Sequence, residues 1–235
     1  MFDRFRLAAS TADLTEEPQA RGDADLIEFR ADLADEPRAA LAAYDGALPV
    51  LVTNRPTWEG GDADGPDRLS VLTDALDHEA VVAVDVELAT LRGQTEPGDT
   101  DPDALQRQAA AAGVDVIASV HDFDGTPDEA TLDTLLTAAA TAGDVGKLAV
   151  TATDPTDALA LLSATEQATD RGLRVATMAM GAAGAHTRAV APVYGSVIGY
   201  APVRAAAATA PGQYDLATLR RLVDELGATG ETTRR

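Results

Sequence analysis

The chain contains a single lysine, Lys147, against 17 arginines. Lys147 lies in the apolar run 145–150, which predicts a buried strand. Arginine replaces lysine in ion pairs and in solubility, but it cannot act as a nucleophile toward a carbonyl group. A lysine kept where an ammonium group is costly therefore indicates a need for a primary amine. On its position alone, chance survival under codon bias or salt adaptation explains this lysine equally well.

Charged and polar side chains gather on one face of the predicted strands. Successive side chains of a strand alternate between its faces, so in the predicted strand 81–88 the valines leave Asp85 and Glu87 on the opposite face. The same alternation places the following residues on one common face: Glu28, Arg30, Thr53, Arg55, Asp85, Glu87, Ser119, His121 and Lys147. Burial of so many charges is unfavourable without a function. An internal ion-pair network that only fixes strand register is the alternative.

An amine and an imidazole in one pocket can perform Schiff-base chemistry. A neutral lysine condenses with a ketone or aldehyde to give an iminium, which acidifies the adjacent C–H bond. His121 suits the removal of that proton, because its ordinary pKa lies near the working pH. Glu59, just past the third predicted strand, is placed to orient the imidazole.

Three arginines favour an anionic, oxygen-rich substrate. Arg30, Arg55 and Arg188 can grip a carboxylate through two parallel hydrogen bonds. As neighbouring cations they would also help burial to lower the pKa of the lysine. The other two histidines, His78 and His186, are interpreted as peripheral, and scattered histidines without cysteine give no convincing metal-ligand set.

Eight strand-like runs alternate with helical patterns and supply the frame for these residues. The predicted strands are 4–10, 25–32, 49–55, 81–88, 115–122, 145–151, 174–181 and 196–202. The clearest helices are 67–79, 102–112, 127–142, 154–172 and about 215–226, several opened by a capping residue before proline, as at Thr126 and Asp154.

This alternation predicts a single-domain α/β fold, a (β/α)₈ TIM barrel over residues 1–226, followed by a polar tail, 227–235. A doubly wound sheet is the runner-up. It would favour a glycine-rich phosphate loop after the first strand, but residues 10–14 contain no glycine. In a barrel, the charged side chains would meet at the carboxyl ends of the strands, where barrel enzymes hold their sites.

Composition limits the class of protein and its partners. The 235 residues carry a net charge of −21 with a pI near 4.2, and the acidic residues are spread along the chain. Such a surface repels nucleic acid and anionic membranes, and with scarce lysine it resembles that of a protein from a high-salt cytoplasm. The absence of cysteine excludes disulfides and thiolate metal sites. No signal-peptide pattern or apolar run of bilayer length is present, so we expect a cytoplasmic protein.

Six motifs, in order along the chain, resemble those of type I 3-dehydroquinate dehydratase, the Schiff-base enzyme of the shikimate pathway. The matching segments are Glu28–Asp32 (E-x-R-x-D), Thr53–Gly61 (T-x-R…E-G-G), Ser119–Phe123 (S-x-H-D-F), Lys147–Val150 (K-x-A-V), Met178–Gly181 (M-x-M-G) followed by Thr187-Arg188, and Thr209–Gln213 (S-A-P-G-Q). The resemblance covers nearly the whole chain. Two family serines are replaced by Thr187 and Thr209, which keep the hydroxyl.

The resemblance implies a dehydration of 3-dehydroquinate to 3-dehydroshikimate, without a cofactor or metal, by a homodimer. It implies that Lys147 forms the iminium, that His121 moves the protons and that Glu59 pairs with His121. The residues implied to bind substrate are Glu28, Arg30, Arg55, Met178, Met180, Arg188, Thr209 and Gln213, the last two on a loop that closes over the ligand.

Two points stay open at this stage. The alanine-rich stretch before Thr209 is about two residues longer than in familiar members, so the register of Thr209 is less certain than that of Gln213. Ser10 either lines the site or caps a helix. The rival functions are another Schiff-base barrel, such as a class I aldolase, and a catalytically silent barrel that only binds ligand.

Overall fold

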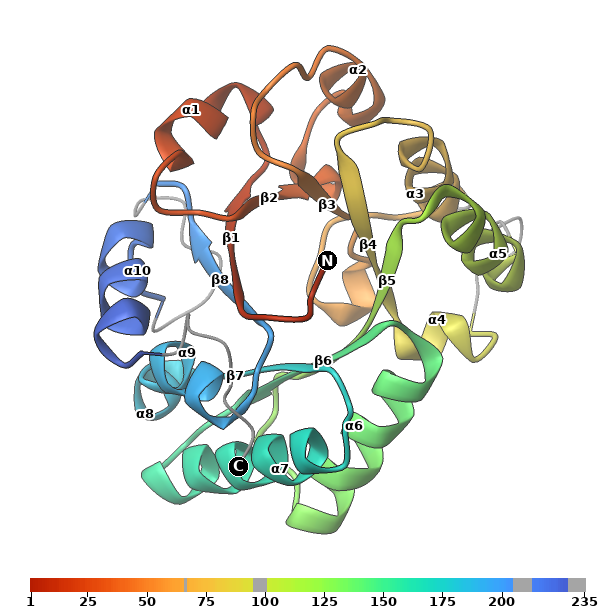
Figure 1. Cartoon of the computed structure of the whole chain (residues 1–235). Coiled ribbons are helices and arrows are strands. Elements are labelled where there is room, and N and C mark those ends of the chain that lie inside the picture. Colours follow the sequence, from red (N-terminus) through yellow and green to blue (C-terminus); the bar gives the residue numbers. More distant parts are fainter. Residues whose placement is uncertain (66, 95–100, 205–212, 228–235) are drawn as a thin grey trace.

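Eight parallel strands form one sheet in the computed structural model, which describes residues 1–65, 67–94, 101–204 and 213–227 (Figure 1). Their order in the sheet is β7-β6-β5-β4-β3-β2-β1-β8. The strands are β1 Arg6–Thr11, β2 Leu26–Arg30, β3 Val50–Thr53, β4 Val81–Glu87, β5 Asp115–Asp122, β6 Val145–Thr151, β7 Val175–Met180 and β8 Ile198–Pro202. Neighbours in sequence are neighbours in space, which excludes the doubly wound alternative.

The sheet curls into a nearly closed barrel. β8 pairs with β1 over five residues, so the last strand returns to the first. Between β7 and β8, an isolated bridge joins Val175 to Ser196, and the Val197 amide donates to the Val175 carbonyl at 2.8 Å. The predicted (β/α)₈ barrel is therefore confirmed, and its β7–β8 seam is looser than its other seams.

Helices surround the barrel and follow the strands (Figure 1). The α-helices are α1 Glu17–Ala20, α2 Pro37–Ala42, α3 Arg68–Ala75, α4 Leu88–Leu91, α5 Pro102–Ala112, α6 Glu129–Ala142, α7 Pro155–Asp170, α8 Gly181–Gly184, α9 Thr187–Val190 and α10 Leu216–Glu225. Short 3₁₀ turns lie at Leu14–Glu16, Ala31–Leu33, Thr57–Glu59 and Ala191–Tyr194. Among the helices of the described ranges, none has the length and apolar character that crossing a bilayer requires.

Local sequence explains where the long helices begin, with one correction. Asp154 caps α7 as predicted, with a reciprocal contact to Asp157 that forms a capping box. The predicted start of a helix at Thr126 is wrong, because Asp128 caps α6 instead. The Thr126 hydroxyl donates to the Thr151 carbonyl at 2.9 Å, which holds this segment against the end of β6. The predicted tail 227–235 falls outside the described residues except for Gly227, and it stays a prediction.

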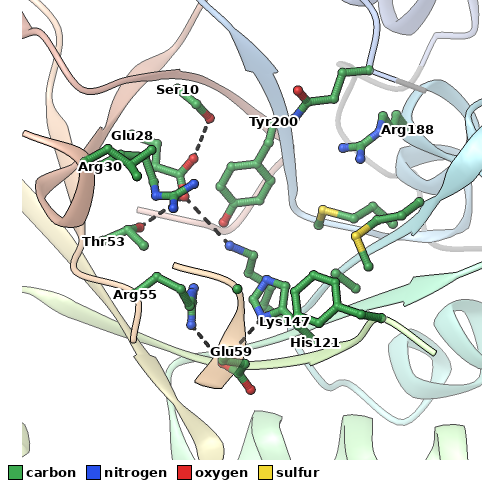
Figure 2. Close-up of a pocket in the computed structure, with 17 residues that line it drawn as sticks. Ser10, Glu28, Arg30, Thr53, Arg55, Glu59, His121, Lys147, Arg188 and Tyr200 are labelled. Atoms are coloured by element: carbon green, nitrogen blue, oxygen red, sulfur yellow. Dashed lines mark hydrogen bonds and ion pairs between the residues drawn. The ribbon is translucent and has the colours of Figure 1, made fainter. Parts of the chain in front are cut away.

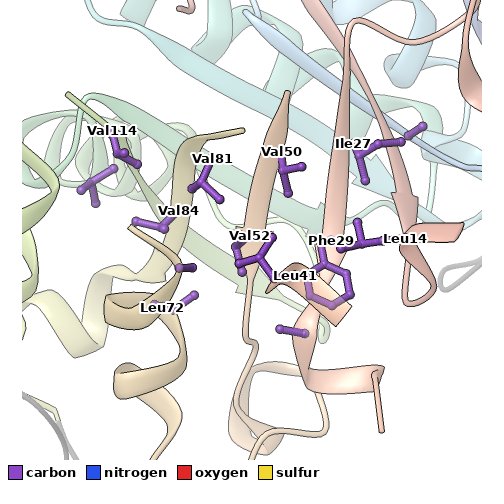
Figure 3. Close-up of a cluster of buried hydrophobic side chains, with 14 of the residues drawn as sticks. Leu14, Ile27, Phe29, Leu41, Val50, Val52, Leu72, Val81, Val84 and Val114 are labelled. Atoms are coloured by element: carbon purple, nitrogen blue, oxygen red, sulfur yellow. The ribbon is translucent and has the colours of Figure 1, made fainter. Parts of the chain in front are cut away.

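Strand alternation divides the buried side chains into two sets. The side chains on one face of the strands pack outward against the helices, as Figure 3 shows for Ile27, Phe29, Val50 and Val52 of β2 and β3. The other parity faces the barrel interior, where its amino-terminal half is apolar. That half is filled by Phe2, Leu26, Leu51, Ala83, Ile117, Val145, Ala176 and Ile198. Polar and charged residues follow on the same faces toward the carboxyl ends of the strands.

Candidate active site

A cavity of about 320 Å³ opens at the carboxyl ends of the barrel strands (Figure 2). Its lining is Ser10, Glu28, Arg30, Leu33, Thr53, Arg55, Glu59, Gly60, His121, Phe123, Lys147, Ala149, Met178, Met180, Arg188, Tyr200 and Gln213. These residues come from every part of the chain and meet because parallel strands end at one rim.

The amine of Lys147 lies deep in this cavity with two carboxylates. The side chain is buried, and Nζ donates a hydrogen bond to Asp85 Oδ2 at 2.9 Å and lies 3.8 Å from Glu28 Oε1. The charged groups that contact the amine are therefore carboxylates, contrary to the expectation that arginine cations would act on it. The nitrogen attacks a carbonyl group only as the neutral amine.

A buried guanidinium organises the acidic groups below the cavity. Arg55 donates to Asp85 Oδ1 at 2.7 Å, to Glu87 Oε1 at 2.8 Å and to Glu59 Oε2 at 3.1 Å. Arg68 donates to the other oxygen of Glu87 at 2.7 Å. Burial alone would raise the pKa of Asp85, but the charges of Arg55 and Lys147 outweigh burial and hold this pKa below its usual value.

The pKa of Glu59 is shifted in the opposite direction from that of Asp85. Burial raises the pKa of Glu59 to about 8. The positive charge of Arg55 opposes this shift, and the nearby carboxylates of Glu87 and Asp85 add to it. Several carboxylates share one guanidinium, and like charges this close disfavour full ionisation. The carboxyl of Glu59 is therefore protonated near neutral pH.

The imidazole of His121 lies beside both Glu59 and the lysine strand. Its Nδ1 is 3.4 Å from Glu59 Oε2, and its ring stacks on Phe123 at a centroid distance of 5.9 Å. β5 pairs with β6 so that His121 lies opposite Ala149, two residues beyond Lys147 on the same face. Burial, with the charges of Arg55 and Lys147, lowers the pKa of His121 well below its ordinary value. A neutral imidazole next to the amine can accept a proton.

Hydroxyls hold the carboxylate of Glu28 on the opposite wall. Thr53 donates to Glu28 Oε1 at 3.0 Å, and Ser10 donates to Glu28 Oε2. Ser10 thus lines the site from within β1 and does not cap a helix. Arg30 is fixed by Asp32, to which its Nε and Nη2 atoms donate at 2.9 and 2.6 Å. A ligand with hydroxyl groups would find donors and acceptors in fixed positions here.

Arg188 is a buried cation without an anionic partner in the described part of the chain. Its Nε makes no hydrogen bond there, and burial lowers its pKa to about 10. The side chain comes from α9, which Thr187 ties to β7: its hydroxyl accepts from the Ala179 amide at 2.9 Å and donates to the Gly184 carbonyl at 2.7 Å. An anion bound in the cavity would neutralise this guanidinium.

Comparison with known proteins identifies the family of this chain. A sequence profile described as "Type I 3-dehydroquinase" matches residues 7–229. The chain belongs to the type I 3-dehydroquinase family. It is 58% identical over 226 residues to a 3-dehydroquinate dehydratase of Haloarcula marismortui, covering 96% of this chain and 97% of that protein. It is 52% identical over 235 residues to the enzyme of that name from Haloquadratum walsbyi, covering 96% and 94%.

A solved structure supports the same assignment. The crystal structure of 3-dehydroquinate dehydratase from Geobacillus kaustophilus superposes with a TM-score of 0.81 at 28% identity and covers 99% of this chain and 93% of that one. The predicted family, barrel and reaction are confirmed: type I 3-dehydroquinases dehydrate 3-dehydroquinate in the shikimate pathway through a Schiff base. Family membership sets the class I aldolase alternative aside.

The cavity gathers most of the residues that the sequence associated with the type I family. Lys147, His121, Glu59, Glu28, Arg30, Arg55, Met178, Met180, Arg188 and Gln213 all line it. Thr209 lies outside the described residues. His186 is exposed, and His78 lies outside the cavity, where its Nδ1 accepts from the Ala80 amide.

Tyr200 and Phe123 are the main lining residues to which sequence reasoning gave no role. Tyr200 lies in β8 with the parity of Ile198, which points into the barrel, so strand alternation was the signal available for it. Phe123 follows His121 by two residues and stacks on its ring.

Proposed function

We propose that this chain dehydrates 3-dehydroquinate through an iminium formed on Lys147, with His121 as the proton carrier. The observation that carries the assignment is the convergence in one cavity of the chain's single lysine, a neutral imidazole and a buried arginine that has no ion-pair partner among the described residues. In this assignment Lys147 and His121 are catalytic, and Glu59 positions His121.

The first step joins the amine to the C3 ketone. The nitrogen forms a bond to C3, and the carbonyl π pair moves to the oxygen, which leaves as water once it has gained two protons. The nitrogen attacks as a neutral amine, after an ammonium has passed one proton to the neutral imidazole of His121, and it gives up a second proton once the C–N bond has formed. Both protons, the first returned by His121, end on the departing water, so the change from ammonium to iminium balances without an external acid. Asp85 and Glu28 keep the positive charge paired while the nitrogen changes from ammonium to iminium.

The second step removes the proton at C2 and the hydroxyl at C1. Neutral His121 takes the C2 proton, and the C–H electron pair forms an enamine with the nitrogen. The enamine then reforms the iminium as the C1–O bond breaks, and the imidazolium returns its proton to the departing hydroxyl as water. Hydrolysis of the conjugated iminium releases 3-dehydroshikimate and restores the lysine. Protonated Glu59 beside Nδ1 limits the drift of the ring between these roles.

Binding of the substrate uses the remaining walls. Arg188 holds the C1 carboxylate, because it is the buried cation without an ion pair in the described ranges. Glu28, Arg30 and Arg55 contact the ring hydroxyls or order the pocket around them. Met178 and Met180 cover the apolar face of the ring, while Thr209 and Gln213 belong to the loop that closes over the ligand.

The direct assay follows the conjugated enone that dehydration creates. In molar salt the wild-type protein should convert 3-dehydroquinate with rising ultraviolet absorbance, whereas K147A should lose at least ~10³-fold of this rate because it lacks the nucleophile. R171A, which changes an exposed arginine, is a control for general effects of substitution. Absence of enone from the wild-type protein would support the silent-barrel alternative instead.

We also propose that the enzyme works as a homodimer in a high-salt cytoplasm. The proposal rests on the charge of −21 and on the resemblance to a commonly dimeric family. Sedimentation equilibrium in molar salt should give twice the chain mass of 24.2 kDa. A mass of one chain at micromolar concentration would refute the dimer.

A further inference from the structure

Tyr200 places a buried hydroxyl in the cavity that has no partner among the residues that the structure describes. The residue is 5% exposed and lines the cavity from β8. Its phenol oxygen is buried and makes no hydrogen bond within the described part of the chain. In Figure 2 the ring points inward between Glu28 and Arg188, with its oxygen toward the amine of Lys147.

The ring of Tyr200 covers the reactive nitrogen. Nζ of Lys147 lies over this ring, 4.2 Å from its centroid. The phenol oxygen points toward this nitrogen in Figure 2 but makes no hydrogen bond to it. An oxygen carried on the carbon bonded to Nζ would lie between the two, within hydrogen-bond reach of the phenol.

The phenol is a donor throughout the working pH range. Burial raises the pKa of Tyr200 well above its ordinary value, and the nearby charges of Glu28 and Asp85 raise it further. The hydroxyl therefore keeps its proton, and the described residues supply no acceptor for it.

Resting on the proposed function, we infer that Tyr200 is a further catalytic residue, which donates a hydrogen bond to the C3 oxygen of the substrate. The bond polarises the ketone as Lys147 attacks and holds the same oxygen until it leaves as water. The phenol keeps its own proton in this step, because the nitrogen supplies both protons of that water. The ring meanwhile faces the positive charge that remains on the nitrogen.

A purely structural role does not account for the hydroxyl. Phenylalanine would fill the same space and keep the ring over the nitrogen. A buried hydroxyl without a hydrogen-bond partner lowers the stability of the fold. The group is therefore unfavourable for the resting fold and becomes satisfied only when an acceptor binds.

The test compares Y200F with Y194F under single-turnover conditions. Tyr194 is exposed in the turn before β8, so Y194F removes the same hydroxyl away from the cavity. Wild-type protein and each variant are mixed with 3-dehydroquinate in molar salt and quenched with borohydride at increasing times. Intact-mass spectrometry then gives the rate at which the reduced adduct forms.

We expect Y200F to form the adduct about 10- to 100-fold more slowly at saturating substrate, with the wild-type rate for Y194F. Urea unfolding should find Y200F at least as stable as the wild-type protein, a change opposite in direction to the loss of rate. Y200L, which removes the ring as well, should be at least as slow and is the second variant if Y200F fails to fold.

The outcomes separate this inference from the proposed function. Equal adduct rates for wild type and Y200F, with normal enone formation, would overturn the role of Tyr200 and leave the dehydratase intact. A loss of stability in Y200F that matches its loss of rate would also overturn it, since the hydroxyl would then be structural. Absence of adduct from the wild-type protein would overturn both.

Discussion

The proton on Glu59 can be tested through the pH dependence of stability. The folded-state pKa of Glu59 is raised to about 8 from an ordinary value of 4.5. Between these values the folded protein keeps a proton that the unfolded chain releases. The contribution of Glu59 to folding stability therefore falls as the pH rises through this window and is level above it.

The size of this stability change follows from the shift in the pKa of Glu59. The difference between about 8 and 4.5 is about 3.5 pKa units, which corresponds to about 5 kcal/mol in total, or about 1.4 kcal/mol per pH unit. E59Q replaces the protonated carboxyl by an amide of the same shape that does not titrate. The stability of E59Q relative to wild type should therefore rise with pH by up to this amount.

Urea unfolding in molar potassium chloride at a series of pH values from about 5 to about 9 measures this difference. Subtraction of the wild-type curve removes the contributions of groups that titrate alike in both proteins. E166Q is the matched control for the substitution itself, because Glu166 is exposed on α7. A flat difference for E59Q would show that Glu59 ionises like an exposed carboxylate, and the account of the acidic cluster would be wrong.

Three further predictions concern other parts of the molecule. The enzyme should keep its activity at pH values below 6.5, because the lowered pKa of His121 keeps the imidazole neutral there. A decrease of kcat/KM on acidification that already begins at or above pH 6.5 would contradict this. G146A should lose about 1–3 kcal/mol, since a Cβ at Gly146 would lie 2.4 Å from the backbone nitrogen of Ala140. G125A, whose Cβ would meet nothing within 4 Å, is its control in urea unfolding. Circular dichroism should reveal loss of structure when salt is removed, because the charge of −21 then repels itself unscreened; an unchanged spectrum would refute the salt dependence.

Alternation along the strands explains why so much of the site could be predicted. Alternate apolar residues of β4, such as Val84 and Val86, pack outward against the helices. Asp85 and Glu87 therefore had to point into the barrel. The predicted bounds of β5 and β6 agree with the structure, because both are short apolar runs between polar turns.

Contacts between residues distant in sequence could not be predicted in this way. Register places Ser119 beside Lys147 and Glu87 beside Ser119, yet the amine bonds to Asp85, two residues earlier. That pairing depends on how the strands tilt around the barrel, which the parity of one strand does not contain. The start of α6 was missed for a similar reason, because Thr126 is held by the distant Thr151.

The surroundings of the Tyr200 hydroxyl could not be predicted from the sequence either. Its parity indicates that the side chain points inward, but the sequence does not reveal whether a buried phenol finds an acceptor. Only the arrangement of neighbouring side chains shows that it stays unpaired within the described residues.

Borohydride trapping tests the central claim, covalent catalysis by Lys147, most directly. The chain has only two primary amines, Lys147 and its N-terminus, so peptide mapping of the trapped protein can assign the adduct without ambiguity. The account predicts one reduced substrate adduct per chain, located on Lys147 and absent from K147A. An adduct only at the N-terminus, or wild-type turnover by K147A, would contradict it.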